Sequence, residues 1–358
     1  MVYYLIFSSL IFASYMRKFG PEIERFLYML FISVLFIFCA YRYEIGCDWL
    51  TYREIFSYDE AVYFFRQGGT LEFGYNLLMI LLKRLDFGFL AFNVCISLIF
   101  FFGLNALAQR SVNPLFFLAL AFPIVIIQLP MSGLRQAAAF GFLCLSFLSF
   151  IDKKPLKFII FTIFATSFHA SAIIFILLIP FIWIQLTIRN AFVIGILSLP
   201  VAAFIFNSSY GAIAMNRYVT GDLSSFGAYF RVGILFLIGI YFALFMRHKW
   251  KLIFPKDYQF ALIGAIGMIL TFLIILPIST VIADRLGFYL WIPALVILAR
   301  IQNIPSKFRQ LMVIACFISF FLMFLFWSNY SYYFARCYDP YQIKFSSMEF
   351  FSSAFLIS

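Results

Sequence analysis

Apolar runs long enough to cross a lipid bilayer recur from one end of the chain to the other. Hydrophobic residues make up 65% of the 358 residues, and the mean hydropathy is +1.01. Inside lipid a segment has to satisfy its own backbone hydrogen bonds, so each run is expected to be a helix. The sequence therefore predicts an all-α, polytopic membrane helix bundle that forms one domain over residues 1–358.

About twelve transmembrane helices are expected. They are predicted at residues 2–16, 26–41, 88–108, 114–129, 134–150, 158–169, 170–188, 190–206, 229–246, 258–276, 286–299 and 310–327. The run at 71–82 is too short to span a membrane, and we interpret it as a re-entrant or interfacial segment. The first residues lack a basic segment, so no cleaved signal peptide is expected.

Basic residues are concentrated in alternate loops. One set of loops carries 15 basic and four acidic residues, whereas 11 of each sign lie on the opposite side. The positive-inside rule makes the first side cytoplasmic, which places both termini and the loops 42–88 and 207–228 outside. The net charge of +11 then reflects orientation and anionic lipid headgroups, and nucleic acid is not an expected partner.

Residues 41–56 are unusually polar for this chain. Five charged side chains fall within thirteen residues, although only 11% of the whole chain is charged. Arg42 follows an apolar run, and Tyr52 lies four residues after Asp48, on the same side of a helix. The stretch fits a polar pocket at the outer membrane face equally as well as an interfacial loop that anchors a helix end.

Arg135 and Gln136 lie at the start of an outer helix, after Gly133 and before three alanines. An arginine one turn into a membrane helix is costly unless it meets an anion or water. Because the planar guanidinium fork donates two parallel hydrogen bonds, it suits a phosphate. We favour a binding site here over an arginine that reaches for the headgroups.

Two further titratable residues are candidates for proton transfer. His169 lies between two apolar runs, where it could act as a base, bind phosphate or cap a helix. Glu72 opens the short run at 71–82. Its position is equally consistent with a pKa raised by apolar surroundings, which suits a base, and with an ion pair to one of the arginines.

Other polar residues on the outer side are less distinctive. Arg217 lies in the loop 207–228, Arg231 begins the next helix, and Asp284-Arg285 opens another helix, where a local cap and ion pair is the simpler account. Tyr341 belongs to the aromatic turn Tyr338-Asp-Pro-Tyr, which could stack on a sugar ring or anchor the chain at the membrane.

Several kinds of site are not indicated. The six cysteines form no Cys-x-x-Cys pair, and a bridge between Cys47 and Cys337, both in polar loops, has no support from spacing. With two histidines and no Cys/His cluster, a protein-bound zinc site is not expected. Phosphate-binding Gly-rich loops, a cytoplasmic Asp-x-Asp motif and Gly-x-Ser-x-Gly are also missing.

Several of these stretches, in this order, resemble one protein family. They are Arg42…Gly46-x-Asp48…Tyr52…Phe56, Glu72-x-Gly74, Gly133-x-Arg135-Gln136, Phe168-His169-x-Ser171 and Tyr338-x-Pro340-Tyr341. Together they resemble the EpsG family of bacterial polysaccharide polymerases, which is related to the Wzy O-antigen polymerases. The similarity spans almost the whole chain, although the loop 207–228 is shorter than is usual in the family.

The resemblance implies a glycosyltransferase of C-type (GT-C-like) architecture in the bacterial cytoplasmic membrane, with its active site facing the periplasm or the outside. The donor would be an oligosaccharide on undecaprenyl pyrophosphate, and the acceptor a lipid-linked repeat unit. Membrane lipids and a chain-length regulator protein are further candidate partners. By analogy with the architecture, the transfer would invert the anomeric centre.

The residues support the same chemistry independently. Arginines at the outer face can stabilise the charge that builds on a departing pyrophosphate, so neither a metal nor another cofactor is expected. Asp48, Glu72 or His169 would accept the proton of the attacking hydroxyl, with the carboxylates ahead of the histidine. An O-antigen ligase would use the same chemistry. A flippase or other transporter of lipid-linked sugars would need charges along a central path and internal repeats, and the sequence shows neither.

Overall fold

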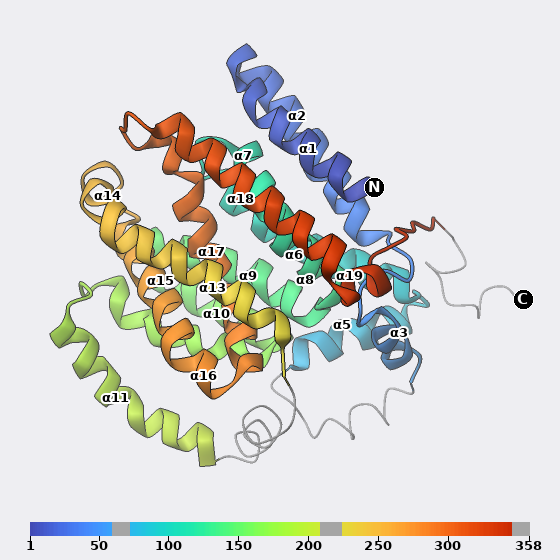
Figure 1. The fold of residues 1–358 in the computed structure, drawn as a ribbon. Helices are drawn as coiled ribbons and strands as arrows, with labels where there is room; N and C mark the ends of the chain where they lie inside the picture. Colours follow the sequence, from blue (N-terminus) through green and yellow to red (C-terminus); the bar gives the residue numbers. More distant parts are fainter. Residues whose placement is uncertain (59–71, 208–223, 346–358) are drawn as a thin grey trace, which may run out of the picture. The chain divides into compact units, whose positions relative to one another are not determined.

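The computed structural model describes residues 1–58, 72–207 and 224–345, and its regular structure within these ranges is helical apart from one isolated bridge between Arg42 and Ile343 (Figure 1). The α-helices are Val2–Tyr15 (α1), Pro21–Ala40 (α2), Trp49–Ser57 (α3), Phe73–Arg84 (α5), Phe89–Ala108 (α6), Pro114–Ala121 (α7), Ile127–Ser132 (α8), Leu134–Ile151 (α9), Pro155–Phe168 (α10), Ile188–Asn207 (α11), Phe226–Tyr241 (α13), Arg247–Ile253 (α14), Tyr258–Leu270 (α15), Leu276–Ile278 (α16), Thr280–Ala299 (α17), Arg309–Tyr330 (α18) and Tyr332–Cys337 (α19). The 3₁₀ segments are Met16–Phe19 (η1), Ala170–Ile182 (η3) and Ile301–Asn303 (η6), and the π-helical segments are Phe122–Ile126 (η2), Phe242–Met246 (η4) and Thr271–Ile275 (η5).

The all-α membrane fold is confirmed for the described residues. Eight helices there are long and apolar enough to cross a membrane, and four shorter apolar helices accompany them, including α1 and α10. Each predicted apolar run falls on one of these helices. The expected twelve crossings thus depend on four helices that are shorter than the roughly 20 residues of a typical span. The run predicted at 71–82 forms the 12-residue helix α5, which is also below that length.

The chain divides into two compact units. The first comprises Met1–Leu145, Phe161–Ile173 and Ala299–Ser358, and the second comprises Ser146–Ile160 and Ile174–Leu298. The long helix α9 begins in the first unit and ends in the second, α10 runs from the second unit into the first, and η3 runs from the first unit back into the second. Each unit has its own polar cluster between membrane helices.

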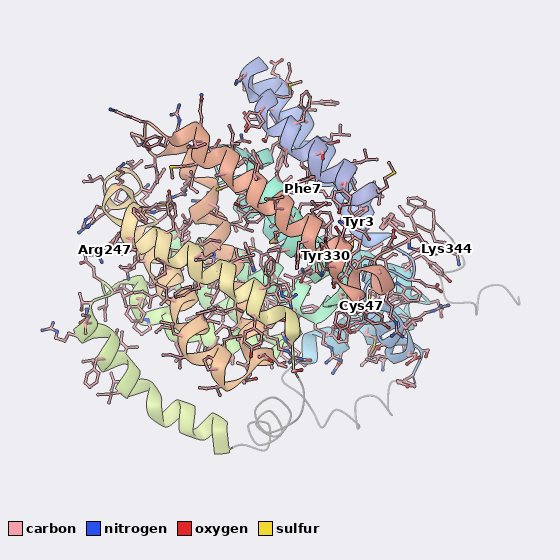
Figure 2. All side chains as sticks on the ribbon, in the orientation of Figure 1. Tyr3, Phe7, Cys47, Arg247, Tyr330 and Lys344 are labelled. Atoms are coloured by element: carbon pink, nitrogen blue, oxygen red, sulfur yellow. A yellow bond between two sulfur atoms is a disulfide. The ribbon has the colours of Figure 1, made fainter. Side chains whose placement is uncertain are left out.

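The core of the first unit is aromatic. Tyr3 and Phe7 lie on α1 (both labelled in Figure 2) and contact Phe324 of α18, and Phe7 also stacks against Phe122. Small residues allow the closest contact between helices: a side chain on either Gly103 of α6 or Gly141 of α9 would collide with the backbone of the facing helix. Such residues at helix crossings are typical of membrane bundles, where close backbone approach takes the place of hydrophobic driving force.

A break between α8 and α9 positions the start of α9. The α8 helix contains Pro130 and ends at Gly133, whose amide donates to the carbonyl of Leu129 at 2.9 Å. Gly46 presses against the Met131 carbonyl, so tightly that any β-carbon there would clash, and its φ of 101° favours glycine. The loop after α2 therefore fixes this break from one side.

The C-terminal segment is fastened to the loop after α2. Cys47 and Cys337 form a disulfide across 290 residues of sequence, a bond that their spacing did not indicate. Beside it, the amide of Tyr43 donates to Gln342 and the amide of Lys344 donates to Tyr41. We call residues 338–344 the C-terminal strap.

The second unit packs α13 against α15, and both helices pass into π-helical segments, η4 and η5. Gly264 of α15 leaves space for Pro293 of α17, because a β-carbon there would clash with the proline ring. A π-helical turn widens the helix locally and is often found at functional sites. The loop predicted at 207–228 lies largely outside the described residues.

Candidate active site

A carboxylate with three partners forms the polar centre of the first unit. Glu72 Oε2 accepts a hydrogen bond from Arg135 Nη1 at 2.7 Å. Glu72 Oε1 lies 2.8 Å from His169 Nδ1 and also accepts from the amide of Ala170 at 3.2 Å. The cluster joins residues that are 63 and 97 positions from Glu72 in the sequence.

Local structure brings these three side chains together. Glu72 is the residue before α5, and Gly74 lets the start of α5 lie directly on Ser167 near the end of α10. His169 follows α10 at the change to the 3₁₀ helix η3, where its amide still bonds to Ala165. Arg135 is the second residue of α9, directly after the break at Gly133.

Aromatic rings support the arginine. The Arg135 guanidinium carbon lies 4.6 Å from the centre of the Tyr75 ring, in cation–π contact. Tyr52 of α3 lies beyond it, with its ring centre 6.3 Å from that of Tyr75. Burial raises the pKa of Tyr52 to about 12, although the charge of Arg135 acts against the rise, so the phenol stays protonated at neutral pH.

The electrostatics of Glu72 distinguish the two alternatives that the sequence left open. Burial by itself raises its pKa, but the hydrogen bond and charge of His169, the charge of Arg135 and the Ala170 amide together lower it to about 2. Of the two alternatives that the sequence left open, the structure supports the ion pair with an arginine and not the raised pKa. The carboxylate is ionised at neutral pH and both its oxygens are occupied.

The ionised carboxylate fixes the histidine. A carboxylate only accepts hydrogen bonds, so Nδ1 of His169 has to carry the proton that is shared with Glu72. In the neutral ring Nε2 is then the acceptor. The side chain of His169 is 12% exposed and that of Arg135 is 18% exposed, so a small part of each remains accessible.

Two residues predicted to contact substrate are held by hydrogen bonds to backbone carbonyls of the protein itself. Arg42 is 1% exposed and donates to the carbonyls of Cys39, Ile45 and Met131 and to the Asn93 side chain. Burial lowers its pKa to about 10, so it remains charged.

Tyr341, in the C-terminal strap, is the second of these residues. Its ring stacks on Phe38 at 4.3 Å, and its hydroxyl donates to the Phe38 carbonyl at 2.7 Å.

Asp48 and Gln136 lie at the edges of the cluster. Asp48 is exposed and precedes α3, where its carbonyl accepts from the Tyr52 amide at 2.9 Å. Gln136 is half-buried next to Arg135. Both residues take part in further interactions within the protein.

The second unit contains a separate ion pair. Arg231 of α13 holds Asp284 of α17 through two parallel hydrogen bonds, from Nε at 2.8 Å and from Nη2 at 2.7 Å. Ser225 donates to the same carboxylate at 2.9 Å, and Phe288 lies beneath the guanidinium. The carboxylate thus pairs with a residue of another helix, where the sequence suggested a local pair with Arg285, which is half-buried. Arg217 lies outside the described residues.

Within the part of the chain that the structure describes, no group of three or more His, Cys, Asp or Glu side chains could hold a metal ion. The cluster of the first unit places a histidine acceptor, fixed by Glu72, beside a cation. The sequence did not reveal that Glu72 links them, and it missed Tyr75, whose only signal is its place one turn after Glu72.

A comparison with protein families decides the relationship. The model of the EpsG family matches residues 25–343. The chain belongs to the EpsG family. Neither a curated protein nor a solved structure matches it. EpsG membership confirms the resemblance seen in the motifs and makes the chain a membrane protein of polysaccharide biosynthesis.

Proposed function

We propose that this EpsG protein is a polysaccharide polymerase. It would join oligosaccharide repeat units carried on undecaprenyl pyrophosphate at the outer face of the bacterial cytoplasmic membrane, without a metal ion. The observation that carries the proposal is that one carboxylate, Glu72, binds both Arg135 and His169. It brings a base and a cation into one small site, which is what glycosyl transfer from a pyrophosphate requires.

His169 would act as the proton acceptor. Its Nε2 would take the proton from the attacking hydroxyl of the acceptor sugar as that oxygen bonds to the anomeric carbon of the donor. The ring then becomes an imidazolium, and the ionised Glu72 stabilises it across the 2.8 Å contact. Glu72 itself is a poor base because its pKa is about 2. This assignment places His169 ahead of the two carboxylates.

Arg135 would stabilise the leaving group. As the bond from the anomeric carbon to the phosphate oxygen breaks, the electron pair leaves with the lipid pyrophosphate. A guanidinium at that point stabilises the new charge. Glu72 holds Arg135 through one nitrogen, Nη1, and Tyr75 supports its plane. We assign Arg42 a positioning role. Its Nε donates a hydrogen bond to the Met131 carbonyl, next to the helix break at Gly133 after which Arg135 follows.

Two independent features support an outward orientation. The uneven distribution of basic residues is one. The other is the disulfide between Cys47 and Cys337, since such bonds persist in oxidising compartments. It lies at the same end of the first unit as the cluster, because Gly46, the neighbour of Cys47, packs on Met131.

The test uses purified protein in lipid vesicles with a lipid-linked repeat unit and a chelator, and resolves products by length on a gel. The wild type is expected to give a ladder of products, whereas His169→Ala should lose about 10²–10⁴-fold in rate. The chain has two histidines, and the matched control is His248→Ala, at an exposed position in α14. A single transfer to a different acceptor would identify a ligase. Movement of the lipid without release of polyprenyl pyrophosphate would identify a flippase, and normal activity of His169→Ala would remove the proposed base.

A further inference from the structure

The loop after α2 is held in place by the end of the chain. Cys47 is bonded to Cys337, and the carbonyl of Cys337 also accepts a hydrogen bond from the amide of Gly46 at 2.7 Å. A few residues away, the amide of Lys344 donates to the carbonyl of Tyr41 at 3.1 Å. Figure 2 labels Cys47 and Lys344. The position of this loop therefore depends on one covalent bond and on hydrogen bonds to the chain end.

Gly46 connects this loop to the start of α9. Its α-carbon lies against the Met131 carbonyl, backbone against backbone, with no flexible side chain between the two. Met131 is two residues before Gly133, whose carbonyl accepts from the amide of Ala137 at 2.8 Å in the first turn of α9. Close-packed interiors compress little and transmit displacements. A shift of Gly46 therefore moves the helix start that carries Arg135.

Arg135 is sensitive to such a shift because its supports belong to another helix. Its guanidinium donates to Glu72 at 2.7 Å and lies 4.6 Å from the centre of the Tyr75 ring. Both supports lie at the start of α5. A displacement of about 1 Å at a catalytic group can cost about 10²-fold in rate. Movement of α9 relative to α5 is therefore enough to slow the reaction.

The disulfide is accessible to a reductant. Cys47 is exposed and Cys337 is half-buried, whereas the other four cysteines are free thiols. A dithiol reductant attacks one sulfur through its thiolate, and the S–S bond breaks. Its second thiolate then displaces the protein from the mixed disulfide. The dithiol thus supplies two electrons and two protons, the protein gains two thiols, and the reductant becomes a disulfide.

We propose that the bond between Cys47 and Cys337 positions Arg135 through Gly46 and Met131, so that transfer is fast in the oxidised protein and slow after reduction by a dithiol. The two cysteines are positioning residues, because they act through the backbone of the loop. The inference rests on the proposed function for the reaction that responds, whereas the contacts from the chain end to α9 belong to the fold.

The first test measures polymer formation in lipid vesicles before reduction with dithiothreitol, after it, and after reoxidation. Reduction should lower kcat about 10²-fold with little change in KM, because Arg135 acts on charge that develops in the transition state. Reoxidation should restore the rate. The assay temperature is kept below the melting transition of the reduced protein, so that unfolding does not cause the loss.

Two cysteine variants control for the reagent. The double variant Cys47→Ser, Cys337→Ser should be slow and indifferent to dithiothreitol. Cys95→Ser, which removes a free thiol of α6, should respond as the wild type does. A fast double variant, or one that still responds to the reductant, would overturn the proposal.

Arg135→Lys separates positioning from a general loosening of the protein. This variant has already lost the contact that the disulfide is proposed to position, so reduction should change its residual rate little. Arg247→Lys, at an exposed position of α14, is the matched control and should keep the full response. An equal fold-loss in Arg135→Lys and Arg247→Lys would overturn the proposal.

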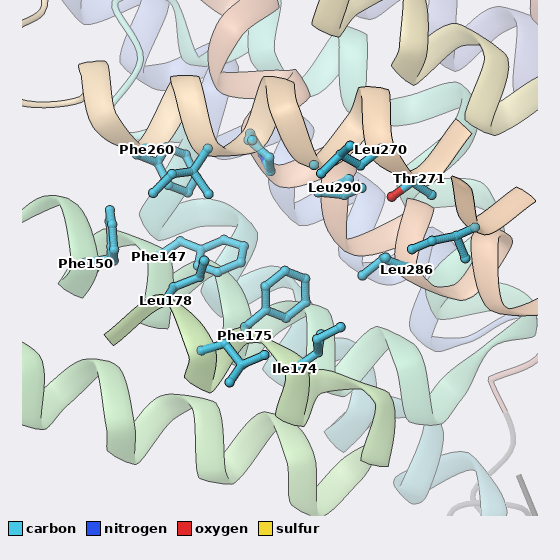
Figure 3. A pocket seen from close by; sticks show the side chains of 16 residues that line it. Phe147, Phe150, Ile174, Phe175, Leu178, Phe260, Leu270, Thr271, Leu286 and Leu290 are labelled. Carbon is cyan, nitrogen blue, oxygen red and sulfur yellow. The ribbon is translucent and has the colours of Figure 1, made fainter. Parts of the chain in front are cut away.

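Hydrogen exchange read by mass spectrometry follows the contacts without turnover. Reduction should speed exchange of the amides of residues 134–138 in the first turn of α9. The reference is α15, which belongs to the second unit and lines an apolar cavity there (Figure 3). Unchanged exchange at 134–138, or equal polymer formation in both redox states, would contradict this inference alone. Faster exchange in a protein that forms no polymer in either state would contradict the proposed function alone.

Discussion

Replacing Glu72 by glutamine is the most informative single change, because it keeps the size of the side chain and removes one acceptor oxygen. Three donors converge on the two oxygens of Glu72: His169 Nδ1 and the Ala170 amide on one, Arg135 Nη1 on the other. The amide of glutamine has a single oxygen. If the NH₂ group of the glutamine faces Arg135, two hydrogen-bond donors oppose each other. If it faces His169 instead, the histidine ring has to accept at Nδ1, so its proton moves to Nε2.

The structure gives the size of the stability change. The pKa of Glu72 falls from 4.5 to about 2 in the folded protein. Each pKa unit corresponds to about 1.4 kcal/mol, so the ionised carboxylate contributes about 3 kcal/mol to the free energy of unfolding. Because the folded pKa is the lower one, this contribution is complete above pH 4.5 and is lost as the pH falls toward 2. Glu72→Gln should remove it at neutral pH.

Two measurements follow the change. Thermal melting at neutral pH should show Glu72→Gln to be less stable than the wild type, and the difference should shrink on acidification toward pH 2. Polymer formation should fall by about 10²–10⁴-fold, because the general base is displaced or presented in the wrong tautomer. The control is Glu54→Gln, which removes an exposed carboxylate of α3. The reasoning is refuted if Glu72→Gln matches Glu54→Gln in melting temperature, in acid sensitivity and in activity.

Three more changes test other parts of the structure. Arg135→Lys keeps the charge but loses the planar fork, so the folded variant should be about a hundred- to thousand-fold slower. Arg247→Lys, at the exposed start of α14, should polymerise normally, and equal rates of the two variants would reduce Arg135 to a membrane anchor. Cys337→Ser should unfold more easily by roughly 2–5 kcal/mol in denaturant titrations, and an unchanged midpoint would show that the disulfide adds nothing to the packing of the C-terminal strap. Asp284→Asn removes the carboxylate that pairs with Arg231 between membrane helices, so the free energy of unfolding should fall by roughly 3–5 kcal/mol in the same titrations. A smaller loss than that of Cys337→Ser would indicate that water reaches the pair.

The helices and the individual members of the cluster could be predicted from the sequence. Apolar runs in lipid have no other way to satisfy their backbone, so their helical form follows directly. Glu72, Arg135 and His169 stood out because ionisable groups at the ends of membrane helices are costly. Their convergence could not be predicted, because no local pattern connects residues that are 63 and 97 positions apart.

The distinction between positioning and contacting residues also depends on the fold. Arg42 and Tyr341 have the chemistry of substrate contacts, yet backbone carbonyls of their own protein accept their hydrogen bonds. A sequence shows that a donor is present but not which acceptor is nearest. The same holds for Cys47 and Cys337, whose separation of 290 residues carries no pairing signal.

That separation has a consequence for how the protein is made. Cys47 leaves the ribosome early, and Cys337 emerges only after α18, the last long apolar helix of the described chain, has been synthesised. The covalent ring can therefore close only after the membrane-length helices of the described chain have all been synthesised. A chain that stops before Cys337 would keep a thiol at an exposed position of the loop after α2. Closure of the disulfide thus reports that synthesis has passed α18.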